Sequence, residues 1–359
     1  MALRAVISGV GGHLWPLPDR ARMRALRFHG IGDLRLEEID DPSPGPGEAV
    51  VAVEACGVCG SDLHFLDGSA RTAYVPITLG HEVAGRVESA DGLDAGTPVL
   101  VAVGVSCGRC HMCTAGRVNL CEQGRVIGID FDGGLADRIA VPSSMLIERP
   151  AGLDAVTAAT AVDAGATAYH AVVRRGKVGA GDSVLVIGAG GLGSYGLQIA
   201  RNAGAAPVIV ADTDPGALER AEALGADEVV LVEEGTSIGR TTKLFTDGGV
   251  DVALEFVGRA STVDAAVKAL RPGGTAVAVG VGTEPVTTLP PVLWSNNEYT
   301  LTGSYGSLAG DAERVLAALA DGSLTAPPTE PVSLDDAAAV ITATAAGRRR
   351  SRGRIVVTP

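Results

Sequence analysis

Short apolar runs alternate with helical segments along the second half of the chain. Runs rich in Val, Ile and Leu predict strands at 183–187, 207–211, 228–232, 251–257 and 275–281. Helices are expected between these strands, at 192–203, 215–224 and 261–270. Strands and helices that alternate in this way are typical of an α/β fold with a doubly wound parallel sheet.

Two of the expected helices carry capping signals. Asp214 stands directly before Pro215, a pair typical of a helix N-cap and the first helical position. Ser261 is the expected N-cap of the later helix, and the Pro-Gly-Gly sequence at 272–274 marks its end. Both signals support the predicted helices.

A glycine-rich turn joins the first predicted strand to the first predicted helix. Gly188, Gly190 and Gly193 form the pattern G-x-G-x-x-G. Such glycines permit a tight turn and let a pyrophosphate approach the N-terminus of a helix. An ordinary strand–helix turn is the alternative, but strand, turn and helix occur here in the order that dinucleotide binding requires. The predicted cofactor-binding turn comprises Gly188, Gly190, Gly191, Leu192 and Gly193.

An acidic residue follows at the distance that this motif requires. Asp212 ends the second predicted strand, about 20 residues beyond the glycines. A carboxylate there accepts hydrogen bonds from a ribose 2′-hydroxyl and repels a 2′-phosphate, so NAD is favoured over NADP. Asp212 could instead cap a helix, although Asp214 fits that role better.

Composition limits the classes of partner. The chain has 359 residues, enough for about two domains. Its net charge of −13 argues against binding to nucleic acid or to an anionic membrane. No apolar run is long enough to span a bilayer, and residues 1–22 lack the features of a secretory signal. We therefore expect a cytoplasmic protein in which residues 1–22 are a loose extension or Met23 is an alternative start.

Four of the six cysteines lie within fifteen residues, at 107–121. Their spacing, C-x2-C-x2-C-x7-C, lets the thiolates converge on one ion and complete a closed tetrahedral shell. An iron–sulfur cluster is the competing metal, and disulfides are disfavoured in a reducing compartment. The pattern predicts a structural zinc site, which has no open position for catalysis. Its expected ligands are Cys107, Cys110, Cys113 and Cys121.

Two further elements carry a family resemblance: CGVCGSDLH at 56–64 and GHE at 80–82. Together with the four-cysteine lobe and the glycine turn, in this order, the chain resembles the zinc-dependent medium-chain dehydrogenase/reductase family, alcohol dehydrogenase type. The resemblance extends over nearly all of 23–359. It implies a GroES-like, β-rich catalytic domain formed by 23–164 and 304–359, with the zinc lobe at about 104–124. A Rossmann NAD-binding domain at 165–303 is inserted between these two parts.

The resemblance also implies a catalytic zinc, the second zinc ion of each subunit. Cys59 and His81 match two of its ligands. Many relatives place a cysteine as the third ligand, but the corresponding stretch 161–165 contains Asp163 instead, as in some bacterial secondary-alcohol dehydrogenases. One thiolate and one carboxylate still neutralise Zn²⁺ and leave a fourth position open to water or substrate.

Roles for nearby residues follow from the same resemblance. Ser61 would contact the alcohol oxygen, and His64 would end a proton relay to solvent. Asp62 would orient the imidazole of His81, and Glu82 would be a transient ligand or a carboxylate that tunes the local field. Alternatives remain: His64 could be an exposed loop histidine, and Asp62 could cap a helix.

Three further positions bear on the cofactor contacts and on the metal ligands. Gly60 stands where many relatives place a cation near the pyrophosphate, whereas Arg354 matches another family position that reaches this region. Cys56 could pair with Cys59 as a redox C-x-x-C, but pairing would remove a zinc ligand. Cys56 is therefore expected to be buried and inert.

The expected reaction is the reversible oxidation of a primary or secondary alcohol to an aldehyde or ketone. Zinc lowers the pKa of the bound alcohol, and the resulting alkoxide transfers a hydride to NAD⁺. Two alternatives stay open: a sorbitol- or threonine-type dehydrogenase, and a non-catalytic redox sensor that binds zinc and NAD. The expected partners are a small alcohol or carbonyl substrate and further copies of the chain, with a homotetramer favoured over a dimer.

Overall fold

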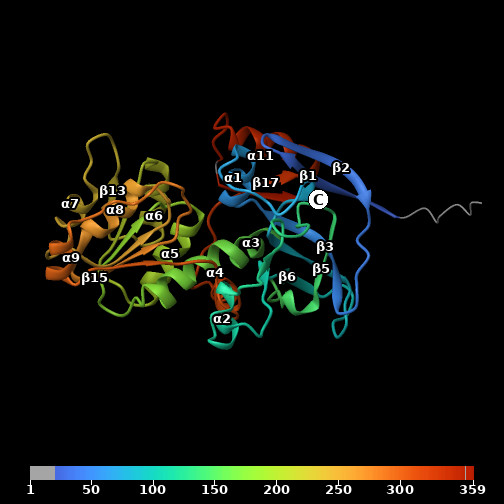
Figure 1. Ribbon diagram of the computed structural model, residues 1–359, viewed down its shortest axis with the longest axis horizontal. Coiled ribbons are helices and arrows are strands. Elements are labelled where there is room, and N and C mark those ends of the chain that lie inside the picture. The colour runs from blue at the N-terminus through green and yellow to red at the C-terminus, as the bar shows by residue number, and fades with distance from the viewer. Residues whose placement is uncertain (1–20, 352) are drawn as a thin grey trace, which may run out of the picture.

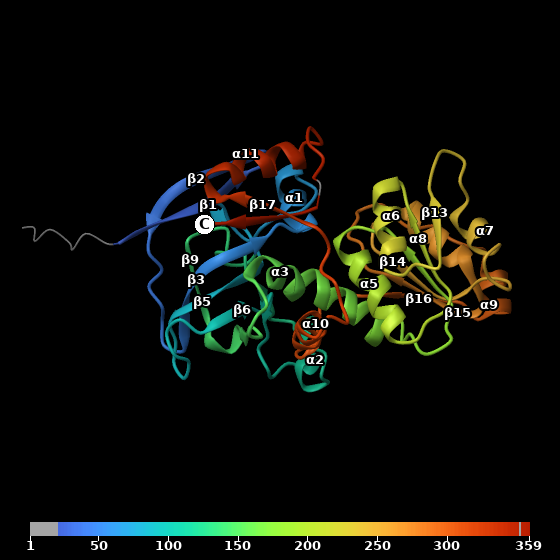
Figure 2. The ribbon, with the colours of Figure 1, turned by 180° about the vertical axis from the view of Figure 1, so that it is seen from behind.

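The computed structural model describes residues 21–351 and 353–359, which form two bodies joined by a central helical run (Figures 1 and 2). The expected extension at 1–22 lies outside the described residues except for its last two. The choice between Met1 and Met23 as the start stays a prediction. No described helix is long and apolar enough to cross a membrane.

The first body is built on mostly antiparallel β-structure that contains a seven-stranded sheet, in which, among the described strands, only β17 and β18 pair in parallel. Its strands follow the order β10-β6-β5-β3-β18-β17, and β9 also pairs with β3. The bounds are β3 Glu48–Gly57, β5 Glu82–Ser89, β6 Pro98–Val101, β9 Arg138–Pro142, β10 Leu146–Glu148, β17 Thr329–Ser333 and β18 Arg354–Thr358. Because β17 and β18 lie at 329–358, this body contains both the first and the last of the described residues.

Smaller sheets and helices complete the first body. One sheet has the order β2-β1-β4, and a two-stranded sheet pairs β7 with β8. These strands are β1 Arg22–Gly30, β2 Asp33–Asp40, β4 Ile77–Thr78, β7 Gly104–Val105 and β8 Arg125–Val126. The helices are α1 Gly60–Asp67, α2 His111–Thr114 and α11 Leu334–Ala345. Short 3₁₀ turns occupy Val118–Leu120 and Ser143–Met145.

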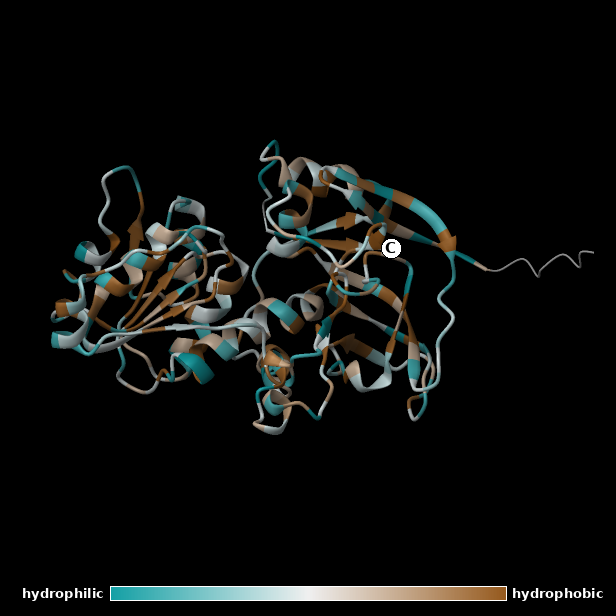
Figure 3. Cartoon of the chain, viewed as in Figure 1, coloured by the Kyte–Doolittle hydropathy of each residue, from teal (hydrophilic) through white to brown (hydrophobic). Residues whose placement is uncertain are grey.

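The second body contains a six-stranded parallel sheet with the order β13-β12-β11-β14-β15-β16. Its strands are β11 Val184–Ile187, β12 Val208–Asp212, β13 Glu228–Leu231, β14 Val250–Glu255, β15 Leu270–Ala278 and β16 Thr300–Gly303. Its helices are α5 Gly191–Asn202, α6 Pro215–Ala223, α7 Ile238–Thr242, α8 Ala260–Ala269 and α9 Pro291–Asn297. Apolar strands run through the interior of both bodies (Figure 3).

The predicted doubly wound parallel sheet is confirmed, and its five predicted strands each match an observed strand within a few residues. Asp214 is the N-cap of α6 as expected, with its side chain accepting the backbone N–H of Gly216. The expected cap at Ser261 is wrong, because α8 already begins at Ala260. The hydroxyl of Thr262 accepts the backbone N–H of Arg259, which starts the helix earlier than the serine signal indicates.

A helical run at 155–175 lies between the two sheets (Figures 1 and 2). It consists of α3 Ala155–Thr160, a π-helical segment Ala161–Gly165, α4 Ala166–Tyr169 and a second π-helical segment His170–Arg175. Helix α10 Asp311–Ala320 follows the last strand of the parallel sheet along the chain and packs against this run. The run thus carries residues of the first π-helical segment to the junction of the two bodies.

Candidate metal centres and dinucleotide site

The four clustered cysteines converge in a small lobe around α2. The Sγ atom of Cys110 lies 3.5 Å from that of Cys113 and 3.9 Å from that of Cys121, and the Sγ atoms of Cys107 and Cys113 are 4.0 Å apart. A tetrahedral zinc with bonds of about 2.3 Å separates its sulfurs by about 3.8 Å. An iron–sulfur cluster would spread them further, because several irons and sulfides stand between. The sulfur geometry fits a single zinc ion.

Backbone groups of the lobe stabilise anionic sulfur. The N–H of Cys107 points at the Sγ of Cys121, at 3.2 Å, and the N–H of Cys110 points at the Sγ of Cys107, at 3.3 Å. Backbone N–H groups of Cys113 and Glu122 lower the pKa of the Cys110 thiol to about 6. Thiolate is the form that binds metal, so the lobe favours that form at Cys110, whereas burial raises the pKa of Cys113 to about 11.

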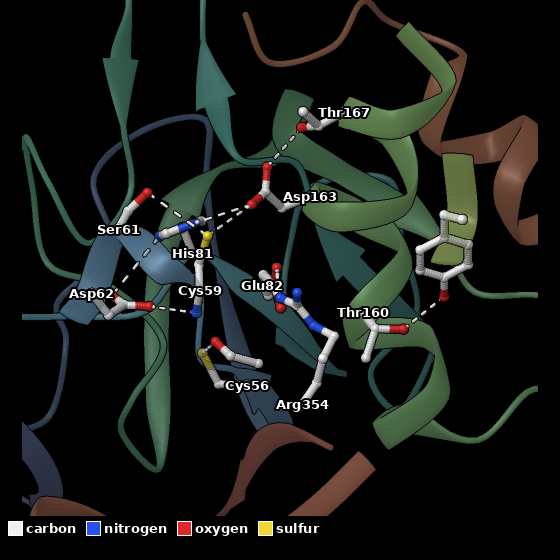
Figure 4. A network of polar contacts seen from close by, with 12 residues as sticks. Cys56, Cys59, Ser61, Asp62, His81, Glu82, Thr160, Asp163, Thr167 and Arg354 are labelled. Carbon is white, nitrogen blue, oxygen red and sulfur yellow. Dashed lines mark hydrogen bonds and ion pairs between the residues drawn. The ribbon is translucent and has the colours of Figure 1, made fainter. Parts of the chain in front are cut away.

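The second cluster joins three residues from distant parts of the chain. Cys59 is the N-cap of α1, His81 directly precedes β5, and Asp163 lies in the first π-helical segment. Their ligand atoms all lie within 4.8 Å of one another (Figure 4). The Oδ2 atom of Asp163 is 3.4 Å from the Sγ of Cys59 and 3.5 Å from the Nε2 of His81.

These separations fit a metal ion. A tetrahedral zinc with ordinary bond lengths places a sulfur about 3.6 Å from an oxygen ligand and a nitrogen about 3.3 Å from it. Three protein ligands leave a fourth vertex for a small molecule, which distinguishes this site from the closed four-cysteine lobe. Sulfur, imidazole and carboxylate together form a donor set that suits zinc.

Electrostatics at this cluster favour a cation. Burial alone would lower the pKa of His81, but the charge of Asp62 and the contact with Asp163 hold it well above its ordinary value. Burial alone would raise the pKa of Asp163, but the hydrogen bond and charge of His81 hold it well below. Burial and the negative Asp163 raise the pKa of Cys59. The site thus places a carboxylate and a thiol beside the protonated imidazole of His81. A metal ion bound there would displace that proton.

Asp62 supports both the helix and the imidazole. Its Oδ2 accepts the backbone N–H of Cys59 at 2.9 Å, so the expected alternative of a helix-capping carboxylate is confirmed. Its Oδ1 lies 4.0 Å from the Nδ1 of His81, a charge contact that is longer than a hydrogen bond. The fully buried carboxylate therefore holds the metal-binding turn together and faces the imidazole.

Ser61 and His64 follow Cys59 on α1. The Oγ of Ser61 lies 3.7 Å from the Sγ of Cys59, beside the cluster. The side chain of His64 is 37% exposed, and its Nδ1 contacts the Oγ of Ser69 at 2.9 Å. The hydroxyl of Ser69 in turn donates to Asp67. A histidine in this setting has one ring nitrogen held by the protein and direct access to water.

Glu82 pairs with Arg354 next to the cluster (Figure 4). The carboxylate of Glu82 is fully buried, and one of its oxygens accepts from the Nη2 of Arg354. Burial raises the pKa of Glu82 to about 7, against the opposing charge of Arg354. Glu82 is not among the converging ligand atoms, so this geometry supports the field-tuning role over that of a transient ligand.

Arg354 also reaches the glycine turn. A Cβ built on Gly191 would lie 2.9 Å from the Cδ and 3.3 Å from the Cγ of Arg354. The guanidinium therefore lies between Glu82 and the N-terminus of α5. It connects the metal cluster with the predicted pyrophosphate site. There the guanidinium cation and the helix N-terminus would both attract the negative charge of the pyrophosphate.

The glycine turn has the form that a bound pyrophosphate requires. Gly188 has a φ of 93°, which favours glycine, and Gly190 is the N-cap of α5. A Cβ on Gly193 would collide with the carbonyl oxygen of Gly188. The turn lies between β11 and β14, where the order of the parallel sheet reverses, which is the usual ligand site of such sheets.

Asp212 lies at the end of β12, directly beside this turn. Its Oδ2 accepts the backbone N–H of Ala189 at 2.6 Å, and its Oδ1 accepts that of Asp214 at 2.8 Å. The carboxylate is therefore fixed against the glycine turn while remaining partly exposed. The residues present fit a dinucleotide, and Asp212 would be the residue that holds its ribose.

Two hydroxyl contacts on the helical run were not predicted from the sequence, and one of them supports Asp163. Thr167 donates from its Oγ1 to the Oδ1 of Asp163 at 3.0 Å. One turn before Asp163, the Oγ1 of Thr160 lies 2.8 Å from the phenol oxygen of Tyr195 on α5. The four-residue spacing from Asp163 to Thr167 is visible in the sequence, but its meaning depends on the helical run that only the structure shows.

A β-rich body, a parallel-sheet body, a sulfur-only metal lobe and a three-ligand metal cluster together define a zinc-binding dehydrogenase. Comparison with protein families agrees: residues 45–151 match the alcohol dehydrogenase GroES-like domain, and residues 191–321 match the zinc-binding dehydrogenase model. The chain belongs to the family of zinc-binding, medium-chain alcohol dehydrogenases. The expected GroES-like and Rossmann architecture is thereby confirmed.

Individual relatives show the range of the family. The chain is 34% identical to the NAD-dependent alcohol dehydrogenase of Saccharolobus solfataricus over 72% of its own length and 78% of the relative. It is 33% identical to the L-threonine 3-dehydrogenase of Pyrococcus horikoshii, over 68% and 72% of the two chains. A solved structure described as a zinc-binding dehydrogenase from Sinorhizobium meliloti 1021, bound to NADP, has a TM-score of 0.86 and 33% identity. That match covers 95% of this chain and all of the other, at 100%.

Proposed function

We propose that the protein is an NAD-dependent alcohol dehydrogenase that reversibly oxidises a primary or secondary alcohol to an aldehyde or ketone. The observation that carries the proposal is the three-ligand cluster of Cys59, His81 and Asp163, linked through Arg354 to the glycine turn. At these two sites, zinc would polarise the alcohol oxygen and NAD would accept the hydride.

The chain's own residues position and deprotonate the substrate. Cys59, His81 and Asp163 hold the metal and leave one side open. Ser61 would accept the hydroxyl proton at its Oγ while releasing its own proton towards the cofactor ribose, and the exposed His64 would end this relay by passing a proton to solvent. Asp62 faces the imidazole of His81 and acts on it through its charge. The buried Glu82 and Arg354 place opposite charges between the metal and the pyrophosphate.

The direct test is an assay of NAD reduction with a panel of alcohols, with and without a chelator. Simple primary and secondary alcohols are expected to be oxidised, and removal of metal is expected to abolish turnover. The panel includes threonine and sorbitol, because a threonine 3-dehydrogenase is among the relatives. Preference for either would support the second candidate. No turnover with any alcohol, despite full zinc and NAD occupancy, would instead indicate a redox sensor.

Asp212 is expected to determine the preference for NAD. In Asp212→Asn, the affinity for NAD should fall about 10- to 100-fold, since a hydrogen bond to a charged group contributes about 1.5–3 kcal/mol. The affinity for NADP should fall less or rise, because the repulsive carboxylate is gone. Kinetic constants for both cofactors check this, with Asp214→Asn as the neighbouring control. Equal losses for the two cofactors would contradict it.

Removing one ligand of the four-cysteine lobe is expected to affect stability rather than chemistry. Cys113→Ser should lower the zinc content by about one ion per chain and lower the melting temperature, because structural zinc contributes directly to folding. Metal analysis and thermal unfolding measure both effects. Activity per mole of folded protein should change little at low temperature. Unchanged zinc content would exclude Cys113 as a ligand.

We further propose that the protein is a homo-oligomer, a tetramer built from dimers. Strand β16 ends the parallel sheet and pairs only with β15 among the described strands. It carries no charged residue, and Leu301 is 38% exposed. Uncharged open edges invite another strand, so a second copy would continue the sheet. Leu301→Arg should reduce the mass found by light scattering, whereas Ile31→Arg, on the other body, should not.

We also propose domain boundaries, a cellular location and partners. The domain boundaries are proposed at 164/165 and 303/304, near the π-helical segment that carries Asp163 and at the end of β16. A cytoplasmic location is proposed because all six cysteines, each of them described, are free thiols that suit a reducing compartment. The proposed partners are a small alcohol or carbonyl compound and further copies of the chain, without nucleic acid or membrane.

A further inference from the structure

Asp163 has two carboxylate oxygens, and the structure gives them different partners (Figure 4). Oδ2 faces the Sγ of Cys59 and the Nε2 of His81, at 3.4 and 3.5 Å. Oδ1 accepts the hydroxyl of Thr167 at 3.0 Å. We propose that Thr167 is a positioning residue that occupies Oδ1 and thereby restricts Asp163 to one-oxygen coordination of the metal. The inference rests on the proposed role of Asp163 as a zinc ligand.

The helical run makes this contact specific. Thr167 follows Asp163 by four residues, at the transition from the π-helical segment to α4. A threonine inside a helix commonly donates to the backbone carbonyl four residues before it. Here the hydroxyl donates to the side chain of that residue instead. Thr167 is only 9% exposed, and its β-branched side chain has few rotamers, so the hydroxyl is held in place.

Restricting the carboxylate has a chemical consequence. A carboxylate that binds through one oxygen supplies one ligand and, with sulfur and imidazole, leaves the fourth tetrahedral vertex open. A carboxylate that turned and bound through both oxygens would occupy part of that vertex. The hydroxyl of Thr167 therefore helps to keep the substrate position open and orients the ligand, as hydrogen-bond partners of metal ligands generally do.

Thr160 provides a matched control on the same helical run. Its hydroxyl is buried like that of Thr167, but it contacts the backbone oxygen of Thr157 and the phenol of Tyr195, each at 2.8 Å. Thr160→Val removes a buried hydroxyl without touching Asp163. Its loss is expected to reduce stability while leaving metal affinity near that of the wild type.

The test compares Thr167→Val, Thr167→Ser, Thr160→Val and Asp163→Asn in the full chain. Affinity for zinc at the three-ligand site is measured by chelator competition, and cobalt substituted there is observed by visible absorption. Thr167→Val should lower the affinity about 10- to 100-fold. It should also weaken the intense bands of four-coordinate cobalt, because a higher coordination number reduces their intensity. Thr167→Ser restores the donor and should recover most of the affinity and the spectrum.

The outcomes separate this inference from the proposed function. One outcome is that Thr167→Val keeps the affinity and spectrum of the wild type while Asp163→Asn loses the metal. This would overturn the role of Thr167 and still support Asp163 as a metal ligand. Retention of metal in Asp163→Asn would overturn both. Equal losses in Thr167→Val, Thr167→Ser and Thr160→Val would show a general structural effect and also overturn the inference. If Thr167→Val does not fold, Thr167→Ala replaces it, with zinc at the four-cysteine lobe as the check on folding.

Discussion

Asp163→Asn is expected to lose the metal of the three-ligand cluster and nearly all dehydrogenase activity. The variant keeps the size of the side chain but removes the negative charge that, with the Cys59 thiolate, neutralises a divalent ion. Even outer hydrogen-bond partners of ligands change metal affinity about 10- to 100-fold. Loss of a ligand should therefore exceed about 100-fold. Zinc content should fall from about two ions per chain to about one, because the closed four-cysteine site is untouched.

Asp154→Asn is the control for this variant. Asp154 is the N-cap of α3 on the same helical run, and its carboxylate accepts the backbone N–H of Thr157 at 2.9 Å. Its replacement should cost about 1 kcal/mol of stability at most, since Asn is also a good N-cap. Metal content and kcat/KM should remain those of the wild type. Unchanged zinc and turnover in Asp163→Asn would refute the ligand assignment.

Arg354→Met is expected to destabilise the protein by about 3–5 kcal/mol. Above the pKa of Glu82, which is about 7, removing Arg354 leaves a buried carboxylate charge uncompensated, and this penalty typically reaches that size. Glu82 is fully buried, and the side chain of Arg354 is almost so. The loss should be visible as a lower urea midpoint. Cofactor affinity should fall as well, because Arg354 packs against Gly191 at the start of α5.

A double variant separates the two effects. Glu82→Gln combined with Arg354→Met removes both charges and should recover much of the stability, because a neutral pair has no uncompensated ion. Cofactor affinity should stay low in this double variant. Lys268→Met is the control, since Lys268 forms an exposed pair with Asp264 on α8 and should contribute less than about 0.5 kcal/mol. A loss in Arg354→Met as small as that would contradict the buried-pair account.

The parallel sheet could be predicted from the sequence because local signals and overall pattern agree there. Apolar runs, the glycine turn and Asp214 before Pro215 each identify an element within its own neighbourhood. Strand β16 was not predicted, because its four residues, TLTG, carry no long apolar run. The cap at Ser261 was wrong because the hydroxyl of Thr262, one residue later, takes the N–H of Arg259.

The first body and the individual contacts of the site could be predicted less well from the sequence. Its seven-stranded sheet joins β3 to β18 across about 300 residues, a pairing that no local pattern reveals, and only the family resemblance indicated it. The convergence of Cys59, His81 and Asp163 depends on the pairing of β3 with β5 and on the helical run. Thr167 was missed because its role depends on a π-helical segment whose register cannot be derived from residue spacing.

A crystal structure of the zinc-loaded protein, with anomalous scattering recorded across the zinc absorption edge, tests the central claim most directly. The account predicts a zinc peak about 2.0–2.3 Å from the Sγ of Cys59, the Nε2 of His81 and one oxygen of Asp163, with a fourth position open. A second peak is expected inside the four-cysteine lobe. Metal-replete protein with no peak at the first position, or with Asp163 turned away from it, would contradict the account.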